Sequence, residues 1–515
     1  MHISKKAEII YSESKHAIAN PVSTPIFFPT SFSNYLNYFS TFAPEPFFLI
    51  ALTLIKSISG IRGTIGGKPG DSFSPIDAVK FAAAFGTWIK RSEFPPKVVI
   101  GRDARLSGDM LSNVVTSSLQ SVGIDVIDLG LSTTPTIEMA IPAEEAGGGI
   151  ILTASHNPGN WNAIKMLGST GEFVSAQSGK DILAIAEAED YGFVQVQHLG
   201  KLAKRDEYID WHIEQVLNLH LVDVEAIKAK KFRVAIDCVN STGGIAIPRL
   251  LKALGVEHVE ELYCEPNGRF PHNPEPLPEN ITALSQMLED GNYHLGIAVD
   301  PDVDRLALVC EDGTPFEEEY TLVAVSDYVL SKKPGNTVSN LSSTRALRDV
   351  TEKHGGEHFA SKVGEVNVVE KMKACSAVIG GEGNGGVIYP ELHYGRDALV
   401  GVALFLSHLA NFKGTTKMLK MTYPSYVISK NKIELTPELD VDKVLNKIAE
   451  KYGKNPINRE DGVKIEFDSE WVHLRKSNTE PIIRIYSEST SRATADHLSS
   501  KIISDIKEII ADKED

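Results

Sequence analysis

The segment LGIAVDPDVDR, residues 295–305, contains the pattern that decides the fold class of this chain. Its apolar run, Leu295 to Val299, has the length and composition of a strand that is buried on both faces, as in a parallel sheet. The run ends on Asp300 and passes into a polar loop instead of continuing as strand. The segment therefore predicts a buried strand that ends at a polar loop.

The same unit of an apolar strand followed by a loop recurs at Val98–Ile100, Phe232–Asp237 and Ala377–Gly381. Helical periodicity separates these strands, for example over Thr282–Glu289 and Leu399–Leu409. Ser74 is expected to cap an earlier helix with Pro75 at its first position, and the residues expected on its buried side are Ile76, Val79, Ala83 and Trp88. The alternation predicts an α/β fold whose similar domains have mixed, mostly parallel sheets.

The chain length of 515 residues corresponds to three or four domains of roughly 150 residues each. Residues 1–51 lack regular patterning and are expected to form a poorly ordered N-terminal extension. Three α/β domains are predicted at residues 52–206, 207–312 and 313–424. Residues 425–515 are predicted to form an α+β domain, in which the strands Val463–Phe467 and Ile482–Tyr486 flank a polar loop and a helix covers Thr494–Ala511.

Composition limits the partners of the chain. The 52 Lys and Arg against 68 Asp and Glu leave a net charge of −16, so no nucleic-acid or membrane partner is expected, and an anionic ligand needs a local cationic pocket.

The four cysteines have the spacing of neither a disulfide framework nor paired zinc ligands. The longest uncharged apolar run, Phe47–Ile55, is too short to span a membrane, and no signal-peptide cleavage pattern follows it. A cytoplasmic protein is predicted.

A serine motif follows the apolar residues 149–152. In TASHNP, residues 153–158, the Asn157-Pro158 turn is expected to project the hydroxyl of Ser155, with His156 beside it and Lys165 ten residues further on. These residue types suit a hydroxyl nucleophile and its helpers. A capped turn without catalytic function is the simpler interpretation of the motif alone.

Three carboxylates follow the strand at 295–299. On an extended segment, Asp300, Asp302 and Asp304 would project to one side, and an oxygen-only ligand set of this kind suits Mg²⁺ or Ca²⁺. An EF-hand loop also begins with D-x-D-x-D and would place Glu311 at its twelfth position, although Arg305 stands where that loop needs glycine. A phosphatase of the haloacid dehalogenase type is a further alternative, in which Asp300 would be the nucleophile and Ser155 would have no role.

Two later loops have the composition of ligand-binding loops. In GGEGNGG, residues 380–386, only Glu382 and Asn384 offer functional side chains, which can exchange hydrogen bonds with sugar hydroxyls. In RKSNTEP, residues 475–481, hydroxyls, an amide and backbone N–H groups lie between cations, and Arg484 follows. The loop at residues 475–481 is the candidate for the cationic pocket. Taken alone, residues 380–386 are more simply interpreted as a plain turn, and residues 475–481 as a solvated charged loop.

Taken together and in this order, the four constellations resemble the α-D-phosphohexomutase family, which includes phosphoglucomutase, phosphomannomutase and phosphoglucosamine mutase. The resemblance extends from about Leu52 to the C-terminus. It implies four domains around a central cleft, three of them α/β and the last α+β.

The resemblance also implies roles for individual residues. Ser155 corresponds to the serine that carries a phosphoryl group, and Arg62, in the GIRG turn at 60–63, corresponds to an active-site arginine. One Mg²⁺ per chain is expected on Ser155, Asp300, Asp302 and Asp304. Lys165 or His156 is expected to handle the hydroxyl proton, and Lys165 is favoured because a lysine desolvated in a cleft can have a lowered pKa. The residues expected to bind substrate are Arg305, Glu382, Asn384, Arg475, Ser477, Asn478, Thr479 and Arg484.

The implied reaction moves a phosphoryl group between O6 and O1 of a phosphorylated hexose, through phosphoserine 155 and a sugar 1,6-bisphosphate. Where the sugar loop of the family commonly has Ser and His, this chain has Asn384 and Gly386, a form that resembles archaeal-type phosphoglucosamine mutases. Glucosamine 6-phosphate is therefore the expected substrate, and phosphomannomutase or phosphoglucomutase activity is the alternative. A phosphosugar-binding protein without turnover would lack the nucleophile, the metal ligands or the phosphate loop. A monomer or homodimer is expected.

Overall fold

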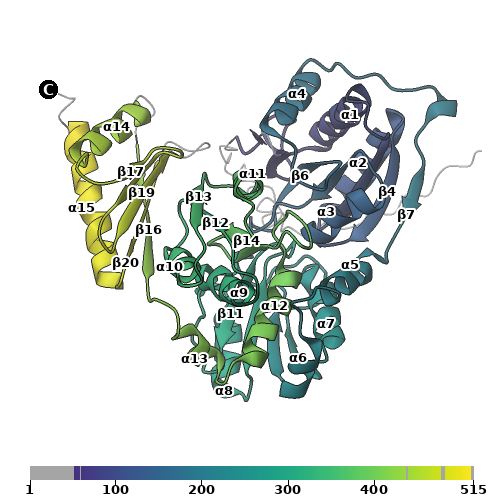
Figure 1. Cartoon of the computed structure of the whole chain (residues 1–515). Coiled ribbons are helices and arrows are strands. Elements are labelled where there is room, and N and C mark those ends of the chain that lie inside the picture. Colours follow the sequence, from purple (N-terminus) through teal and green to yellow (C-terminus); the bar gives the residue numbers. More distant parts are fainter. Residues whose placement is uncertain (1–51, 58–59, 436–438, 477–481, 512–515) are drawn as a thin grey trace, which may run out of the picture. The chain divides into compact units, whose positions relative to one another are not determined.

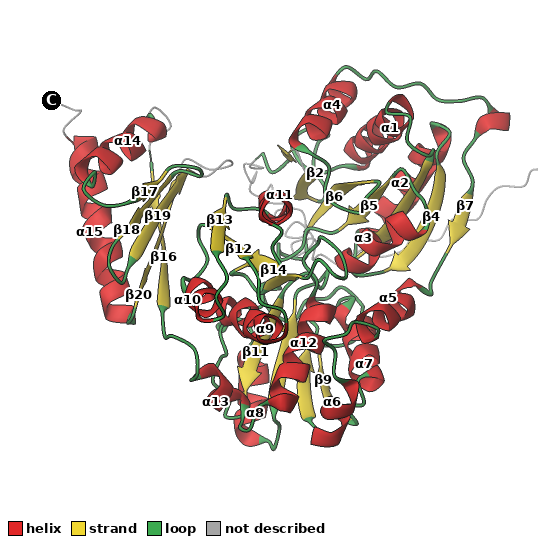
Figure 2. Cartoon of the chain, in the orientation of Figure 1, coloured by secondary structure: helices red, strands yellow, loops and turns green. Residues whose placement is uncertain are grey.

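The computed structural model describes residues 52–57, 60–435, 439–476 and 482–511, which form four sheets and their helices (Figure 1). The predicted extension, residues 1–51, lies outside the described residues, as do Ser477, Asn478 and Thr479 of the predicted phosphate loop. Figure 2 shows that helices accompany every sheet, and the α/β class is confirmed.

The first sheet has seven strands in the order β1-β2-β6-β5-β3-β4-β7. Three of its six strand pairings are parallel, and three are antiparallel. Its strands are β1 (Ile55–Ser57), β2 (Gly60–Thr64), β3 (Lys97–Arg102), β4 (Asp125–Leu131), β5 (Gly148–Leu152), β6 (Trp161–Gly168) and β7 (Leu202–Lys204). Its helices are α1 (Pro75–Arg91), α2 (Gly108–Ser121), α3 (Thr134–Ala143) and α4 (Ala176–Glu187), and a 3₁₀ turn covers Val196–His198.

The two faces of the first sheet are covered by different helices. Successive side chains of a strand point to opposite faces, so Val98 and Ile100 pack in the cluster that contains α1, α2 and α4, whereas Val99 packs against α3. Ser74 caps α1 as predicted, in a capping box with Asp77. The expectation that Ile76 lies on the buried side was wrong, because its side chain is 63% exposed.

The second and third sheets each have four strands, mostly parallel, in the orders β11-β10-β8-β9 and β13-β12-β14-β15. The elements of the second are β8 (Arg233–Asp237), β9 (His258–Leu262), β10 (Leu295–Val299), β11 (Leu306–Cys310), α5 (Tyr208–Leu217), α6 (Val224–Lys230), α7 (Gly243–Ala253) and α8 (Thr282–Asp290). The elements of the third are β12 (Thr337–Asn340), β13 (His358–Ser361), β14 (Ile379–Glu382), β15 (Gly386–Ile388), α9 (Glu318–Lys332), α10 (Ala346–Lys353), α11 (Glu365–Cys375), α12 (Ala398–Asn411) and α13 (Thr416–Lys420).

One hydrophobic core serves both the second and the third sheet. It runs from α5 and α7 through the buried helices α9 and α12, and Phe316 and Phe405 stack edge to face within it at a centroid distance of 5.3 Å. The shared core follows from α12, which is apolar on nearly all sides and can bury that surface only between two layers.

The fourth sheet is antiparallel, in the order β16-β20-β19-β18-β17, and its helices α14 and α15 pack on one face (Figure 2). Its elements are β16 (Val427–Glu434), β17 (Ile457–Asn458), β18 (Val463–Glu466), β19 (Trp471–Lys476), β20 (Ile482–Ser489), α14 (Val441–Lys451) and α15 (Arg492–Ala511). The sequence interpretation placed a loop between β18 and β20, whereas β19 fills the centre of the sheet there. Its short run of Trp471 to Leu474 is buried on both faces, so it lacks the alternation that marks a half-exposed strand.

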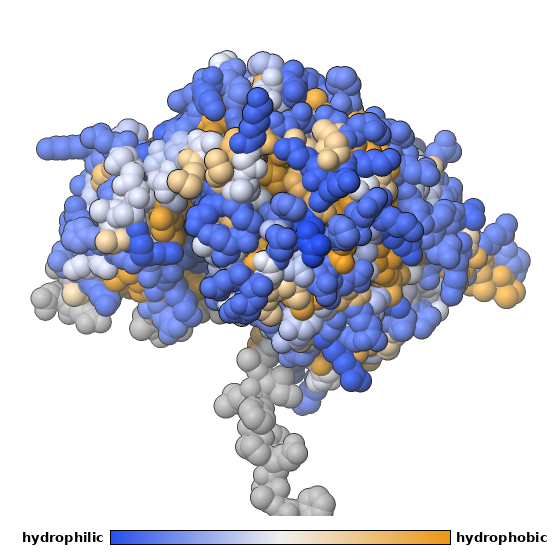
Figure 3. All heavy atoms as spheres, turned by 90° about the horizontal axis from the view of Figure 1, so that it is seen from below, coloured by the Kyte–Doolittle hydropathy of each residue, from blue (hydrophilic) through white to orange (hydrophobic). Residues whose placement is uncertain are grey.

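The surface seen in Figure 3 is mostly hydrophilic, and the hydrophobic residues on it occur in small groups. Within the described ranges, no helix combines the length and the apolar character needed to cross a membrane.

Candidate functional site

A cavity of about 760 Å³ is lined by side chains from the strands and loops of all four sheets. The central cleft predicted from the sequence therefore exists. Its lining contains most of the predicted site residues: Arg62, Ser155, His156, Lys165, Arg305, Glu382, Asn384, Arg475 and Arg484.

Ser155 stands three positions after the end of β5 in a left-handed backbone conformation, with φ of 50°. Such a conformation is unfavourable for a residue other than glycine and persists only where the surroundings impose it. Arg105, fully buried, imposes it here: its guanidinium donates to the carbonyl oxygens of Ser155, Asn157 and Pro158. Asp103 holds that guanidinium at 2.9 Å. The strained turn aims the Ser155 hydroxyl into the cavity.

The hydroxyl of Ser155 meets the acidic loop after β10. Ser155 Oγ donates to Asp300 Oδ2 at 2.9 Å, and His156 Nδ1 lies 3.4 Å from the same Oγ. The first and second constellations of the sequence therefore form one site, although 145 positions separate Ser155 and Asp300.

The three aspartates after β10 are arranged by a turn. The sequence interpretation placed them on an extended segment, which was wrong: Val303 has a φ of 63°, and Asp300 Oδ1 accepts hydrogen bonds from the backbone N–H groups of Asp304 and Arg305 at 3.1 Å. A β-branched residue at positive φ is strongly disfavoured, so the turn is imposed by these bonds. As a result, one carboxylate oxygen from each aspartate lies within 4.8 Å of the others.

The acidic loop has the donor set of a divalent-cation site. Asp300, Asp302 and Asp304 are fully buried, and among the described residues Asp302 Oδ1 and Asp304 Oδ1 have no hydrogen-bond partner. Burial and the neighbouring aspartates raise the pKa of Asp300 well above its usual range. Burying such oxygens without a partner is costly, and Mg²⁺ prefers oxygen ligands of this type. The EF-hand alternative was wrong, because β11 begins directly after Arg305 instead of a helix after the loop.

Lys165 lies opposite the acidic loop, with its Nζ 2.8 Å from Asp302 Oδ2. Burial lowers the pKa of this ammonium, but Asp302 and Asp304 raise it more, so its pKa is above the usual value. The expectation of a lysine with a lowered pKa was therefore wrong. The sequence could not show this, because it depends on a carboxylate brought in from another sheet.

His156 and Arg305 form a linked pair at the wall of the cavity. Arg305 Nη2 donates to His156 Nδ1 at 2.7 Å, and Arg305 Nη1 donates to Glu275 Oε1 at 2.8 Å. Burial and the charge of Arg305 lower the pKa of His156 to about 2, so the imidazole is neutral. Its Nδ1 is thereby engaged by the arginine.

The glycine-rich loop between β14 and β15 presents Glu382 at the cavity. Glu382 Oε1 accepts from Asn340 Nδ2 at 2.8 Å and from the N–H of Gly364 at 3.0 Å, while Asn384 Oδ1 accepts from the N–H of Gly386 at 3.2 Å. The carboxylate of Glu382 is therefore fixed in orientation before any ligand binds.

Arg396 is a site residue that the sequence interpretation missed. Its guanidinium donates to Asp304 Oδ2 at 2.5 Å and to Glu365 Oε2 at 2.9 Å, and its Nη1 lies 3.3 Å from Glu382 Oε2. It thus connects a carboxylate of the acidic loop with the carboxylate of the sugar loop. A Cβ atom at Gly386 would lie 2.4 Å from Arg396 Cδ, so the arginine occupies the space beside the glycine.

Two arginines face each other where the predicted phosphate loop begins and ends. Arg475 on β19 and Arg484 on β20 are direct cross-strand partners, and burial together with the charge of Arg484 lowers the pKa of Arg62. Like charges opposite one another are unfavourable, and Asp461 Oδ2, which lies 2.8 Å from Arg475 Nε, offsets the charge of that arginine. These cations provide the pocket that the net charge of −16 required.

Comparison with known proteins agrees with this arrangement. Four family models match, described as phosphoglucomutase/phosphomannomutase α/β/α domains I, II and III and the C-terminal domain, at residues 54–192, 206–313, 317–426 and 432–504. The domain limits given above, 52–206, 207–312, 313–424 and 425–515, remain our proposal.

Relatives and a solved structure match over most of their length. The phosphoglucomutase/phosphomannomutase of Thermococcus kodakarensis is 36% identical over 440 residues, covering 84% of this chain and 95% of that protein. The phosphoglucosamine/phosphogalactosamine mutase of Sulfurisphaera tokodaii is 30% identical over 464 residues, covering 88% and 98%. A crystal structure of a phosphoglucomutase/phosphomannomutase family protein from Burkholderia thailandensis aligns with a TM-score of 0.76 at 25% identity, covering 89% and 97%. The chain therefore belongs to the α-D-phosphohexomutase family and is a phosphohexomutase.

Proposed function

We propose that the chain interconverts a hexose 6-phosphate and the corresponding hexose 1-phosphate through phosphoserine 155 and a sugar 1,6-bisphosphate. The observation that carries this proposal is the 2.9 Å contact between Ser155 Oγ and Asp300 Oδ2 inside a cavity lined by cations from all four domains. A hydroxyl beside a cluster of carboxylates can carry a phosphoryl group where a cation offsets the added charge.

In the first half-reaction, the bond between phosphorus and Ser155 Oγ breaks, a bond forms between phosphorus and the free hydroxyl oxygen of the sugar, and the proton of that hydroxyl ends on Ser155 Oγ. The product is a sugar bisphosphate. After the sugar turns over, the bond between its other oxygen and phosphorus breaks, phosphorus bonds to Ser155 Oγ, and the serine proton ends on the released sugar oxygen. The Ser155 turn, clamped by Arg105, fixes Ser155 Oγ, which is the leaving oxygen in the first half-reaction and the attacking oxygen in the second. Positioning is the main contribution that a protein makes to phosphoryl transfer.

Charge is managed by residues around Ser155. Asp300, Asp302 and Asp304 would hold Mg²⁺, which when bound supplies a positive charge to the phosphoserine oxygens. Lys165 and Arg62 stabilise the phosphoryl group during transfer. Arg475 and Arg484, together with Ser477, Asn478 and Thr479, hold the phosphate that does not react. Hydroxyls and arginines tolerate either end of the sugar in this position.

For the substrate, we infer glucosamine 6-phosphate, with weaker activity on glucose phosphates. Glu382 accepts hydrogen bonds from ring hydroxyls that glucose, mannose and glucosamine share, so it cannot select at C2. The GEGNGG form of the loop, with Arg396 beside Gly386, supports the inference, as does similarity to an archaeal enzyme named for glucosamine and galactosamine phosphates. The name of the Thermococcus relative supports the alternative of glucose and mannose phosphates.

The proposal is tested by Ser155→Ala, with Ser500→Ala on the exposed face of α15 as the matched control. Ser155→Ala should lower mutase activity by about 10⁴-fold or more, because the group-carrying hydroxyl is lost, while the circular dichroism spectrum stays unchanged. Mass spectrometry should find phosphate on the peptide that contains Ser155. Full activity of the variant, or release of inorganic phosphate as the main reaction, would contradict the mutase mechanism.

The substrate is tested separately with coupled assays on glucosamine 1-phosphate, glucose 1-phosphate and mannose 1-phosphate. The expected order of kcat/KM places glucosamine 1-phosphate first. A higher kcat/KM for either of the other two would replace the inferred substrate and leave the reaction type intact.

A further inference from the structure

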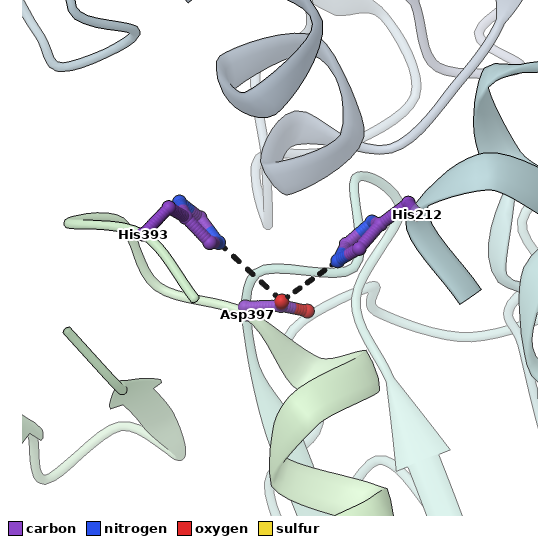
Figure 4. Close-up of side chains that lie close together, drawn as sticks. All are labelled: His212, His393 and Asp397. Carbon is purple, nitrogen blue, oxygen red and sulfur yellow. Dashed lines mark hydrogen bonds and ion pairs between the residues drawn. The ribbon is translucent and has the colours of Figure 1, made fainter. Parts of the chain in front are cut away.

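A second cluster of possible metal ligands stands outside the lining of the catalytic cavity, although Asp397 directly follows Arg396, which belongs to that lining (Figure 4). It consists of His212 on α5 and of His393 and Asp397 in the segment that leads into α12, where Asp397 is the N-cap. His212 Nε2 lies 3.0 Å from Asp397 Oδ2, and His393 Nε2 lies 3.4 Å from the same oxygen. Figure 4 shows both imidazoles pointing at this carboxylate.

The distances in the cluster match those between ligands of one metal ion. With bonds of about 2.0–2.1 Å to nitrogen and oxygen, neighbouring ligand atoms of a tetrahedral zinc site lie about 3.3 Å apart. The two rings stand at 89° to one another, so they approach Asp397 from different directions instead of stacking. Three ligand atoms are thereby placed around one point.

The other ring nitrogen of each imidazole also has a polar neighbour. His212 Nδ1 lies 2.9 Å from Thr136 Oγ1, and His393 Nδ1 lies 3.4 Å from Glu138 Oε2. Thr136 and Glu138 both belong to α3, so one helix supplies both neighbours. Partners of this kind fix the tautomer of metal-binding histidines and leave the remaining nitrogen free to coordinate. The arrangement directs both Nε2 atoms at Asp397.

Glu138 is a buried carboxylate beside the cluster. Its side chain is 98% buried, and within the described part of the chain neither of its oxygens has a hydrogen-bond partner. Gly395 makes room for it, since a Cβ atom at that position would lie 1.8 Å from Glu138 Oε2. A buried carboxylate without a hydrogen bond is costly unless positive charge is brought close to it.

Access to the cluster is provided by a cavity of about 470 Å³, separate from the catalytic one. Glu138 and His393 line it, together with Trp211, Gln215 and Tyr394. His212 and Asp397 are fully buried behind them, whereas the side chain of His393 is 12% exposed. An ion or water can therefore reach the open side of the cluster through His393.

We propose that His212, His393 and Asp397 bind a borderline divalent transition metal of the Zn²⁺ type, with Thr136 and Glu138 orienting the two imidazoles. Imidazole nitrogen suits zinc, cobalt and nickel, whereas Mg²⁺ takes oxygen ligands. Because the ligands come from α5 and from the start of α12, and their partners from α3, the metal ties together three segments that are distant in the sequence.

The experiment uses the full-length protein, stripped of metal and then saturated with Mg²⁺ so that the acidic loop is occupied. Titration with Co²⁺ should produce the visible absorption bands of a tetrahedral site with nitrogen ligands, at one ion per chain, and Zn²⁺ should abolish them. His393→Ala should weaken Co²⁺ binding by about a hundredfold or more, since loss of an outer partner alone costs 10- to 100-fold.

Two controls separate this cluster from other sites. His272→Ala removes an imidazole whose Nε2 also lies 3.0 Å from an aspartate oxygen, that of Asp237. Among the described residues, His272 belongs to no group of three possible metal ligands. Asp302→Asn removes a carboxylate of the acidic loop. Both variants should keep the Co²⁺ bands. Loss of the bands in Asp302→Asn, or their full retention in folded His393→Ala, would overturn the proposal.

A measurement on the wild-type protein covers the case in which His393→Ala does not fold. X-ray absorption at the zinc edge of the Zn²⁺-loaded protein should show scattering from two imidazole rings. A shell of oxygen ligands alone, or no Zn²⁺ retained in excess Mg²⁺, would show that protons and not a metal hold the two histidines on Asp397.

Discussion

The acidic loop and the histidine cluster are both buried groups of metal-ligand side chains, but they differ in donor atoms and surroundings. Asp300, Asp302 and Asp304 offer only oxygen and face a hydroxyl and the Lys165 ammonium. His212 and His393 offer nitrogen and share a single aspartate oxygen.

The donor atoms and the surroundings indicate which kind of cation each cluster suits. The aspartates of the acidic loop lie directly behind Ser155 and Lys165, which line the catalytic cavity, and there a hard cation could be shared between protein and phosphate. In the histidine cluster, each imidazole has a polar neighbour at its other ring nitrogen, and the three ligand atoms leave one side open, as in zinc sites with three protein ligands. Variants of the two clusters test this contrast.

Asp302→Asn should separate the two clusters most clearly. Removing one charge from the acidic loop should lower kcat/KM by about 10²- to 10³-fold, because a bound cation contributes several kcal/mol to transition-state charge stabilisation. Activity should then need more Mg²⁺, while Co²⁺ binding at the histidine cluster persists. The exposed Asp312→Asn is the control, and normal activity of Asp302→Asn without added divalent ion would disprove the assignment of the acidic loop.

Arg396→Lys tests the arginine that precedes Asp397 in the sequence but donates a hydrogen bond to Asp304 of the acidic loop. A lysine keeps the charge and loses the planar contacts to Asp304, Glu365 and Glu382, so kcat/KM should fall by roughly tenfold to a hundredfold. The Mg²⁺ concentration for half-maximal activity should rise as well, which a purely structural role would not cause. Arg249→Lys, at an exposed ion pair on α7, should change neither quantity.

Thr136→Val tests the outer partner of His212. The variant keeps the shape of the side chain and removes the 2.9 Å contact with Nδ1, so Co²⁺ affinity should fall by about tenfold. Thr337→Val is the matched control, because Thr337 Oγ1 makes a similar contact of 3.0 Å with His358 Nδ1 elsewhere. Equal Co²⁺ affinity in both variants would argue against an orienting role for Thr136.

Glu319→Gln tests a buried carboxylate that belongs to neither cluster. Burial raises the pKa of Glu319 from 4.5 to about 8. The folded chain therefore binds a proton at Glu319 more tightly than the unfolded chain. The stabilisation that this proton gives the folded chain is complete below about pH 4.5 and is lost as the pH rises to about 8. Glutamine does not ionise.

The Glu319→Gln variant should therefore gain about 2–4 °C in Tm relative to wild type near pH 8.5, and much less near pH 5. Thermal unfolding at both pH values measures the difference. The control is Glu318→Gln, at the ion pair with Lys430. The same Tm difference at both pH values would show that Glu319 does not titrate in this range.

Much of the catalytic site could be predicted because its residues occur in contiguous motifs. Ser155 and His156 stand in one turn, and the three aspartates stand in another, directly after buried strands. Strand, turn and residue type are local properties, so the sequence alone indicates them. The helix cap at Ser74 was predictable for the same reason.

Other features of the site depended on long-range contacts. Arg105 clamps the serine turn and Arg396 joins two loops, yet in the sequence each is one arginine among many. The raised pKa of Lys165 comes from Asp302, 137 positions away. Such contacts are set by packing between sheets and leave no periodic pattern.

The amino-acid sequence by itself determined the α/β class, the order of the loops, and the chemical type of the serine, aspartate and arginine groups. The tertiary structure alone decided that His212, His393 and Asp397 meet, since one comes from α5 and the other two precede α12. It also decided that the aspartates converge through a turn at Val303 instead of an extended strand. The physical reason is that hydrophobic periodicity specifies local elements, whereas the shared core between the second and third sheets fixes which of their ends come together.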